Sequence, residues 1–401
     1  MTSCPRTATT FAPPVMQARQ WLADTPVPRG LDLINVSQAA PVDPPPAGLR
    51  QAIADAALSD PSAHLYGAVL GRDDLREEIA HQWSRAYGGR IGHAQVAITS
   101  GCNQAFCAAV AALCGEGDEV ILPMPWYFNH KMWLDMAGVR TVPLPAGAEL
   151  LPDPAEAEAR ITDRTRAIVL VTPNNPGGVE YPADLVHAFH GLAQARGLRL
   201  IIDETYRDFD ARPAAPHDLF ADPGWADTLV HLYSFSKAYR LTGHRVGAMV
   251  AGPDLLAEAE KFLDTVTICP NQLGQIAALW GMRNLGDWLA GERAEILDRR
   301  AAIEDAMPRL TDAGWHLLGC GAYFAYLRHP FDMSSDTLAP RLLGDAGVLL
   351  LPGTMFRPAG DPAGRHEVRI AFANVTRPQI GMLFDRLAGL GWPLAPGAAG
   401  A

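Results

Sequence analysis

Short apolar runs alternate with longer amphipathic stretches from about Leu49 onward. The apolar runs are rich in Val and Ile, as strands are, and the stretches between them have the residue spacing of helices. Strands that alternate with helices predict an α/β fold with a mainly parallel sheet, covered by helices on both faces. The expected strands are 96–99, 119–123, 140–144, 167–172, 198–203, 229–234 and 246–251, and the clearest helices between them are 103–113, 129–137, 182–195 and 253–264.

The pattern changes after about residue 270. A long helical stretch over 273–310 precedes shorter strands and helices, which predicts a smaller α+β domain. The first 46 residues are rich in proline and are expected to form an irregular arm. We therefore expect an N-terminal arm over 1–46 that joins the small domain, a large domain over 47–270 and a small C-terminal domain over 271–401.

Composition excludes several classes of function. The formal net charge of the 401 residues is −11, and no run of Lys or Arg occurs, which argues against a nucleic-acid or anionic-membrane partner. No segment is apolar enough for a signal peptide or a membrane span, so a cytoplasmic protein with a small-molecule substrate is expected. Reduced thiols and no metal site are expected of the six scattered cysteines, Cys4, Cys102, Cys107, Cys114, Cys269 and Cys320.

A lysine lies in a loop between two expected strands. The segment 234–247 reads Ser-Phe-Ser-Lys-Ala-Tyr-Arg-Leu-Thr-Gly-His-Arg-Val-Gly, and its lysine is Lys237. Arg245 follows eight positions later and would offer a fixed positive charge to a phosphate. A nearby cation would also lower the lysine pKa and favour the free amine. By itself the pattern is more typical of a surface lysine near a turn.

Other polar residues follow expected strands, where ligands bind in parallel sheets. Asp203 ends the strand 198–203, although aspartate at such a place also caps helices. Gly101 separates a strand from a helix, and backbone N–H groups at a helix start bind anions. An ordinary strand-to-helix turn would look the same. No GxGxxG or GxxxxGK[ST] pattern occurs at this turn, which argues against a dinucleotide or nucleoside-triphosphate enzyme.

The segment around Lys237 resembles the lysine signature of class I/II pyridoxal-phosphate aminotransferases, which have the fold-type-I architecture of the aspartate aminotransferase superfamily. Further motifs of this family follow in the family's order across most of the chain. The resemblance implies that pyridoxal 5'-phosphate is held as a Schiff base on Lys237. It also implies that Asp203 pairs with the pyridine nitrogen, and that Tyr206 and Asn175 bond to the phenolic oxygen of the cofactor.

The resemblance assigns the remaining contacts as well. It places the cofactor phosphate at Ser100, Gly101 and Cys102, completed by Ser234 and Arg245. In the run Pro-Trp-Tyr-Phe-Asn-His over 125–130, it points to Tyr127 as the residue that stacks on the ring, with Trp126 as the alternative. His130 matches a residue that supports the ring-nitrogen aspartate.

Two residues would complete the site. Tyr66 matches a tyrosine that reaches the cofactor phosphate of a neighbouring subunit, which implies a homodimer with a shared active site. Arg369 matches the arginine that grips the substrate α-carboxylate, for which the planar guanidinium is suited. An exposed arginine on an edge strand is the alternative, but the apolar neighbours of Arg369 on both sides favour a side chain that points inward.

The chain departs from the family pattern in two places. Gly177 replaces the usual threonine in the turn 172–178. The arm segment 35–40 reads Asn-Val-Ser-Gln-Ala-Ala and lacks the glycine that family members often carry there. The substrate contacts of the arm therefore do not carry over from the family.

The expected function is transfer of an amino group between an L-amino acid and a 2-oxo acid, with Lys237, Asp203 and Tyr206 as catalytic residues. Alternatives on the same scaffold are a pyridoxal-phosphate lyase, a cyclopropane-forming activity like that of ACC synthase, and an amino-acid oxidase. A regulatory module is disfavoured because the arm is too short for a helix-turn-helix unit. Arginines that could recognise an acidic substrate side chain, or simply lie on the surface, are Arg72, Arg240, Arg357 and Arg365.

Overall fold

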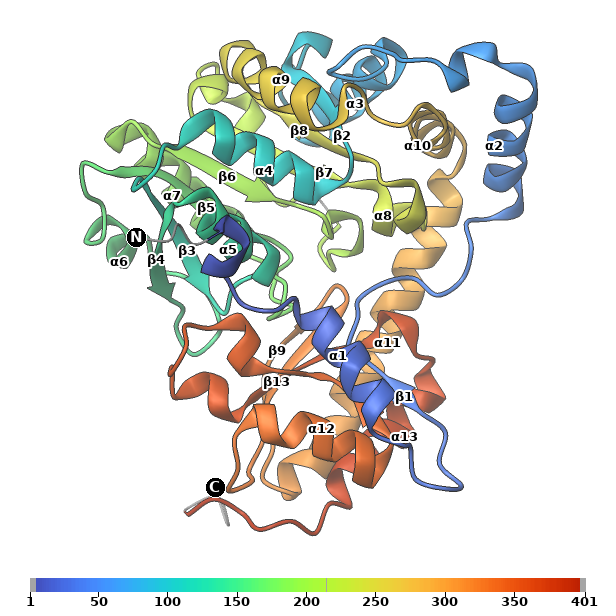
Figure 1. Ribbon diagram of the computed structural model, residues 1–401, viewed down its shortest axis with the longest axis vertical. Coiled ribbons are helices and arrows are strands. Elements are labelled where there is room, and N and C mark those ends of the chain that lie inside the picture. The colour runs from blue at the N-terminus through green and yellow to red at the C-terminus, as the bar shows by residue number, and fades with distance from the viewer. Residues whose placement is uncertain (1–4, 214, 397–401) are drawn as a thin grey trace.

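A seven-stranded sheet forms the centre of the upper part of Figure 1. The computed structural model describes residues 5–213 and 215–396, so Cys4 lies outside the described residues. The strands are β2 (Val96–Thr99), β3 (Glu119–Met124), β4 (Arg140–Pro145), β5 (Thr165–Val171), β6 (Arg199–Asp203), β7 (Leu229–Ser234) and β8 (Gly247–Val250). Their order is β2-β8-β7-β6-β5-β3-β4, with β8 antiparallel to both neighbours and the other pairs parallel. The predicted α/β fold with a mainly parallel sheet is confirmed.

Helices cover both faces of this sheet. One face packs against α3 (Asp73–Ala86), α7 (Ala183–Arg196) and α10 (Gln272–Asn284), and the other against α4 (Cys102–Leu113), α5 (Phe128–Ala137) and α9 (Pro253–Thr267). Successive side chains of a strand point to opposite faces of the sheet. In β6, Leu200 and Ile202 lie in the core on the side of α3, α7 and α10, which we call the first core, and Ile201 lies in the second core, on the side of α4, α5 and α9. The same alternation directs Asp203 toward α4 and α5.

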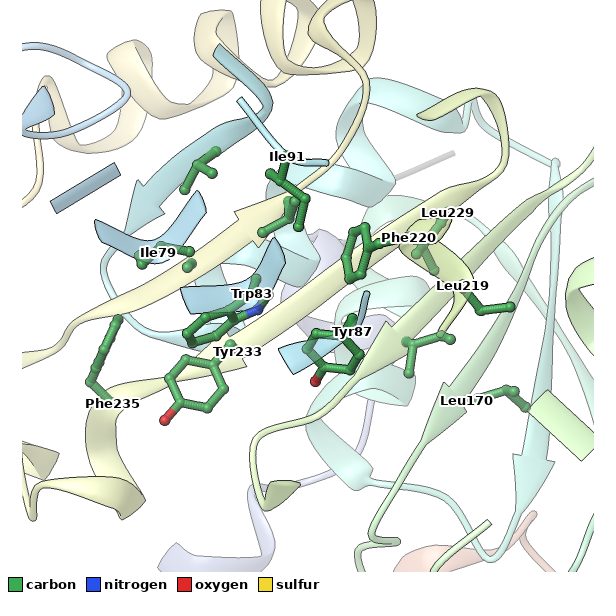
Figure 2. Packing of buried hydrophobic residues seen from close by; sticks show 14 of the residues in the cluster. Ile79, Trp83, Tyr87, Ile91, Leu170, Leu219, Phe220, Leu229, Tyr233 and Phe235 are labelled. Atoms are coloured by element: carbon green, nitrogen blue, oxygen red, sulfur yellow. The ribbon is translucent and has the colours of Figure 1, made fainter. Parts of the chain in front are cut away.

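Aromatic side chains fill the first core (Figure 2). Trp83 of α3 meets Tyr233 of β7 edge to face, with ring centroids 5.0 Å apart, and Tyr87 meets Phe220 in the same way at 5.3 Å. Such pairs add stability beyond the burial of their area. This core lies against β6 and β7, which pair in parallel, and both strands lead directly into the predicted site.

A second, smaller sheet lies in the lower part of Figure 1. Its order is β12-β13-β10-β9, all antiparallel, and its core is closed by three helices. The strands are β9 (His316–Gly321), β10 (Phe324–Arg328), β12 (Leu351–Pro352) and β13 (Glu367–Ala371), and the helices are α11 (Gly286–Asp312), α12 (Ser335–Ala346) and α13 (Arg377–Ala388).

The helical stretch predicted over 273–310 is two helices, α10 and α11, which break at Leu285. Helix α10 contacts α3 and α2 (Ala47–Ser59), and its buried residues Ala277 and Ala278 belong to the first core. The division of the chain at residue 270 stays a prediction, and α10 packs with the residues before it rather than with those after it. Two short helices complete the chain, α6 (Pro154–Glu158) and α8 (Phe235–Ala238).

The expectation that the first 46 residues are irregular is wrong for part of the arm. Helix α1 (Pro14–Asp24) forms there and contacts α12, beside which it lies in Figure 1. Its prolines do not prevent it, because Pro14 stands at the first helical position, where proline is well tolerated. Strand β1 (Ile34–Asn35) then pairs in parallel with β11 (Val348–Leu349), which attaches the arm to the smaller sheet's side of the molecule.

Within the described residues, no helix combines the length and the apolar character that crossing a membrane requires.

Candidate active site

A cavity of about 250 Å³ opens where β5, β6 and β7 end, and the N-terminal arm covers part of it. Its walls come from the large sheet, from β13 and from the arm, which are far apart in the sequence. Most of the predicted site residues line it together: Cys102, Tyr127, Asn175, Asp203, Tyr206, Ser234, Lys237, Arg245 and Arg369.

Lys237 lies in α8, directly after the end of β7. Its Nζ donates a hydrogen bond to the carbonyl oxygen of Ala39 in the arm, at 2.6 Å. Burial, together with the positive charges of Arg245 and Arg369, lowers the pKa of Lys237 from 10.5 to about 8. About a tenth of the molecules therefore carry the free amine at pH 7, several hundred times the fraction of an ordinary lysine. The free amine is the form that attacks a carbonyl group.

Asp203 is a buried carboxylate at the end of β6. Its Oδ1 accepts a hydrogen bond from the backbone N–H of Thr205 at 3.0 Å, and its Oδ2 lies 3.2 Å from Nε2 of His130 in α5. Burial opposes ionisation, but the hydrogen bond and charge of His130 and the bonds from Thr205 outweigh it, so the pKa of Asp203 lies below its usual value. The cavity thus holds a fixed negative charge, which suits a protonated pyridine nitrogen.

Tyr127 and Tyr206 form aromatic walls of the cavity. Asn129 donates to the Tyr127 hydroxyl at 2.8 Å, and burial raises the pKa of Tyr127 to about 12. Trp126, the alternative to Tyr127, is buried in the core beneath α4 and does not line the cavity. The ring of Tyr206 lies 5.7 Å from Lys237 Nζ.

Helix α4 and Arg245 meet at one end of the cavity. Arg245 donates to the Ser236 hydroxyl at 3.2 Å and to the carbonyl of Ser100 at 3.5 Å. Gly101 adopts φ +85°, and a Cβ on Gly247 would lie 2.6 Å from the Gly101 carbonyl carbon, so this approach of β8 to the turn requires glycine. A helix N-terminus beside a guanidinium is an anion site.

Ser100 and Gly101 contribute to this end through their backbone and do not line the cavity with side chains. Ser234 caps α8, because its hydroxyl accepts a hydrogen bond from the Ser236 N–H at 3.2 Å. The Ser234 hydroxyl therefore lies within the same cluster as the Arg245 guanidinium.

Arg369 is buried in β13, between β12 and β10, rather than on an edge strand. It donates to Asn175 Oδ1 at 3.0 Å and to the carbonyl of Ser37 at 2.5 Å, while its Nε has no partner among the described residues. Burial lowers the pKa of Arg369 to about 10, which leaves it charged at neutral pH. A guanidinium with an unused donor at a cavity wall is suited to a carboxylate ligand.

Unlike Ser100 and Gly101, which adjoin this cavity, the predicted site residue Tyr66 lies away from it. Its side chain is 81 % exposed and lines a separate hollow with Arg72 and Gln272. Its proposed contact with the phosphate of a neighbouring subunit stays a prediction.

Several cavity residues escaped the sequence analysis. Thr205, Ser236 and Asn103 lie inside or beside the motifs around Asp203, Lys237 and Gly101, so those motifs were the available signal. Gln38 and Ala39 lie in the arm segment 35–40, whose family contacts did not carry over because the glycine is missing, and Val15 of α1 had no signal in the sequence. The further lining residues are Val15, Gln38, Ala39, Phe128, Asn129 and Val171.

The residues present fit pyridoxal phosphate. The amine of Lys237 and the carboxylate of Asp203 line one cavity, and the anion site at the start of α4 adjoins it. Gly247 and Gly101 leave a cradle there that any larger residue would fill. Arg369 lines another wall, where its guanidinium is suited to a substrate carboxylate.

Comparison with known proteins agrees with this geometry. The profile of the family "Aminotransferase class I and II" matches residues 32–387. An arginine–pyruvate transaminase of Pseudomonas aeruginosa is 31% identical over 83% of this chain and 84% of its own length, and a valine–pyruvate aminotransferase of Mycobacterium tuberculosis is 32% identical over 90% and 92%. An aspartate aminotransferase structure from Thermus thermophilus has a TM-score of 0.84 at 24% identity, covering 97% of this chain and 99% of that one, and this likeness shows the fold.

A profile match across most of the chain and two relatives above 30% identity over most of their length leave one assignment. The chain belongs to the class I and II aminotransferases, enzymes that transfer amino groups with pyridoxal phosphate as cofactor.

Proposed function

We propose that the cavity around Lys237 is the active site of this transaminase, and that it moves an amino group from an L-amino acid to a 2-oxo acid. The observation that carries this proposal is the convergence of Lys237, Asp203 and Arg369 on one cavity, from β7, β6 and β13. A reactive amine, a fixed negative charge and a carboxylate receptor are the groups that the reaction needs.

The cofactor would be held at four places. Asp203 would pair with its ring nitrogen, and Tyr206 and Asn175 would donate to its phenolic oxygen. Tyr127 would stack on the ring. The phosphate would lie against Ser100, Gly101 and Cys102 at the start of α4, with Ser234 and Arg245 closing the cradle. When bound, pyridoxal phosphate supplies an electron sink for the charge that develops at the substrate α-carbon.

Lys237 carries the proton in this scheme. Its Nζ takes the proton from the substrate α-carbon as a general base. It then delivers the proton, as a general acid, to the carbon that receives the amino group. A pKa of about 8 suits both tasks near neutral pH, because neither form of the amine is rare.

Arg369 orients the substrate by its α-carboxylate, with Asn175 holding the guanidinium from one side. The arm lies against the same region, because the carbonyl groups of Ser37 and Ala39 accept hydrogen bonds from Arg369 and Lys237. A substrate carboxylate at Arg369 would replace the contact with Ser37, so substrate binding and displacement of this part of the arm are coupled.

We also propose a homodimer in which Tyr66 of each chain reaches the phosphate of the other site. The exposed position of the Tyr66 ring, with Leu65 66% and Leu58 88% exposed nearby in sequence, supports an interface here. A cytoplasmic location completes the proposal, since buried free thiols such as Cys102 suit a reducing compartment.

The test mixes the purified protein and pyridoxal phosphate with an amino acid, with and without a 2-oxo acid. We expect amino-acid consumption to require the oxo acid, and the Lys237→Ala variant to lose at least about a thousandfold in rate because it lacks the proton carrier. Ammonia release without an oxo acid would instead assign a lyase or an oxidase. A Lys237→Ala variant with near-normal rates would refute the assigned site.

A further inference from the structure

We propose that the amino-acid substrate of this site carries a neutral side chain, and that acidic and basic side chains are disfavoured. The inference rests on the proposed function and deepens it, because it names the substrate class that the same cavity accepts. It follows from where the fold places the charges around the cavity.

The cations that line the cavity among the described residues are Lys237, Arg245 and Arg369. Each already has a task in the proposed function: Lys237 carries the proton, Arg245 binds phosphate and Arg369 binds the α-carboxylate. A substrate with a second carboxylate would need a further cation, since a carboxylate buried without a partner is strongly unfavourable.

The four arginines that the sequence offered for this purpose do not provide it. Arg240 lies three residues after Lys237, but its Nε and Nη2 bind Glu292 at 2.9 Å, and its Nη1 lies 3.4 Å from Asp43. Arg357 binds Glu367 in the same bidentate way, at 2.6 and 3.0 Å. Bidentate pairs of this kind leave a guanidinium little capacity for another carboxylate.

The other two arginines lie farther out. Arg365 is exposed at the surface and does not line the cavity. Arg72 lies in the hollow beside Tyr66, where Asp74 binds it at 3.0 and 2.7 Å. In a homodimer that brings this hollow to the neighbouring site, Arg72 would still be paired with Asp74.

A basic side chain of a substrate would also lack a partner of opposite charge in the cavity. Asp203 is the carboxylate that lines the cavity among the described residues, and it is bound by His130 and Thr205. Its charge is needed at the cofactor ring in the proposed function. A substrate ammonium or guanidinium group therefore meets no available anion.

The remaining wall is uncharged. Val15 of α1, Ala39 of the arm and Phe128 of α5 supply apolar surface, and Gln38 and Asn129 supply amides. Apolar side chains of substrates gain free energy when such a surface takes them out of water. Leucine and methionine are therefore the substrates we use to represent the class.

The experiment titrates the protein loaded with pyridoxal phosphate with L-leucine, L-methionine, L-aspartate, L-glutamate and L-arginine, and follows the visible absorption of the cofactor. We expect leucine and methionine to half-saturate the change at concentrations at least about tenfold below those of the three charged amino acids. The unreactive 2-methylleucine and 2-methylaspartate, which lack the α-proton, give the same comparison as binding alone.

Half-saturation by aspartate, glutamate or arginine at the same concentration as leucine would overturn the neutral-substrate assignment. The proposed transaminase function would still stand. No absorption change with any amino acid would overturn the proposed function itself. The two failures are therefore distinguishable.

A variant pair tests the wall directly. Val15→Arg places a cation at the cavity, and we expect it to improve aspartate relative to leucine by at least about tenfold. Met16→Arg is the matched control, because Met16 is the next residue of α1, is 55% exposed and does not line the cavity. Equal effects of the two variants would show that the α1 wall does not contact the substrate side chain, and would refute its role in the selection.

Discussion

The lowered pKa of Lys237 makes a quantitative prediction about the protein without its cofactor. Burial and the charges of Arg245 and Arg369 move this pKa from 10.5 to about 8. The folded protein therefore binds fewer protons than the unfolded chain between these values. The lowered pKa of Lys237 therefore reduces the free energy of unfolding. This reduction is fully present below pH 8 and disappears as the pH rises toward 10.5. At about 1.4 kcal/mol per pH unit, it reaches about 3 kcal/mol at pH 7 and about 1 kcal/mol at pH 10.

The Lys237→Met variant keeps an unbranched side chain, one atom shorter, and removes its charge. Removing the charge should raise the free energy of unfolding by about 3 kcal/mol at pH 7 relative to the wild type. The lost hydrogen bond to Ala39 should lower it by about 1 kcal/mol at every pH, so the expected net gain at pH 7 is about 2 kcal/mol. Urea unfolding of both cofactor-free proteins at pH 7, 8.5 and 10 measures the difference. Other titrating groups affect both proteins alike, so the change of the difference with pH belongs to Lys237. A difference that stays constant from pH 7 to pH 10 would refute the reasoning.

Three further substitutions test other parts of the structure. Arg369→Lys loses the planar fork, and we expect kcat/KM for the amino acid to fall about 100-fold in steady-state assays, whereas a change below threefold would contradict the carboxylate role. Gly247→Ala forces a Cβ against Gly101, so affinity for pyridoxal phosphate should fall at least about tenfold in a fluorescence titration. Glu204→Gln removes a buried charge that lies 3.2 Å from His217 and 2.9 Å from a second histidine, and should cost about 3 kcal/mol in thermal unfolding.

The local sequence determined the layout of the large sheet and the order of the site motifs. Val96–Thr99 and Leu229–Ser234 form strands with the predicted bounds, because a buried parallel strand is a short apolar run bounded by turn residues. Asp203 is the last residue of such a strand, and Lys237 follows another by three residues. The rule that ligands bind at the carboxyl ends of parallel strands was therefore enough to bring them together.

Local signals failed where the chain's role depends on a distant partner. The proline-rich arm gave no sign of α1. The family resemblance marked the segment 35–40, but the missing glycine left its contacts open, and nothing there indicated that the carbonyl oxygens of Ser37 and Ala39 contact Arg369 and Lys237. These contacts join residues 332 and 198 positions apart, and they exist because β1 pairs with β11.

The sequence by itself determined that this chain forms an α/β enzyme with a lysine, an aspartate and an arginine in family order. Only the tertiary structure decided which charges remain available to a substrate. Arg240 and Arg357 are ordinary candidates in the sequence, but Glu292 and Glu367 bind them in the fold. Residue identity fixes a charge, whereas its counter-ion depends on packing between segments that the chain brings together only on folding.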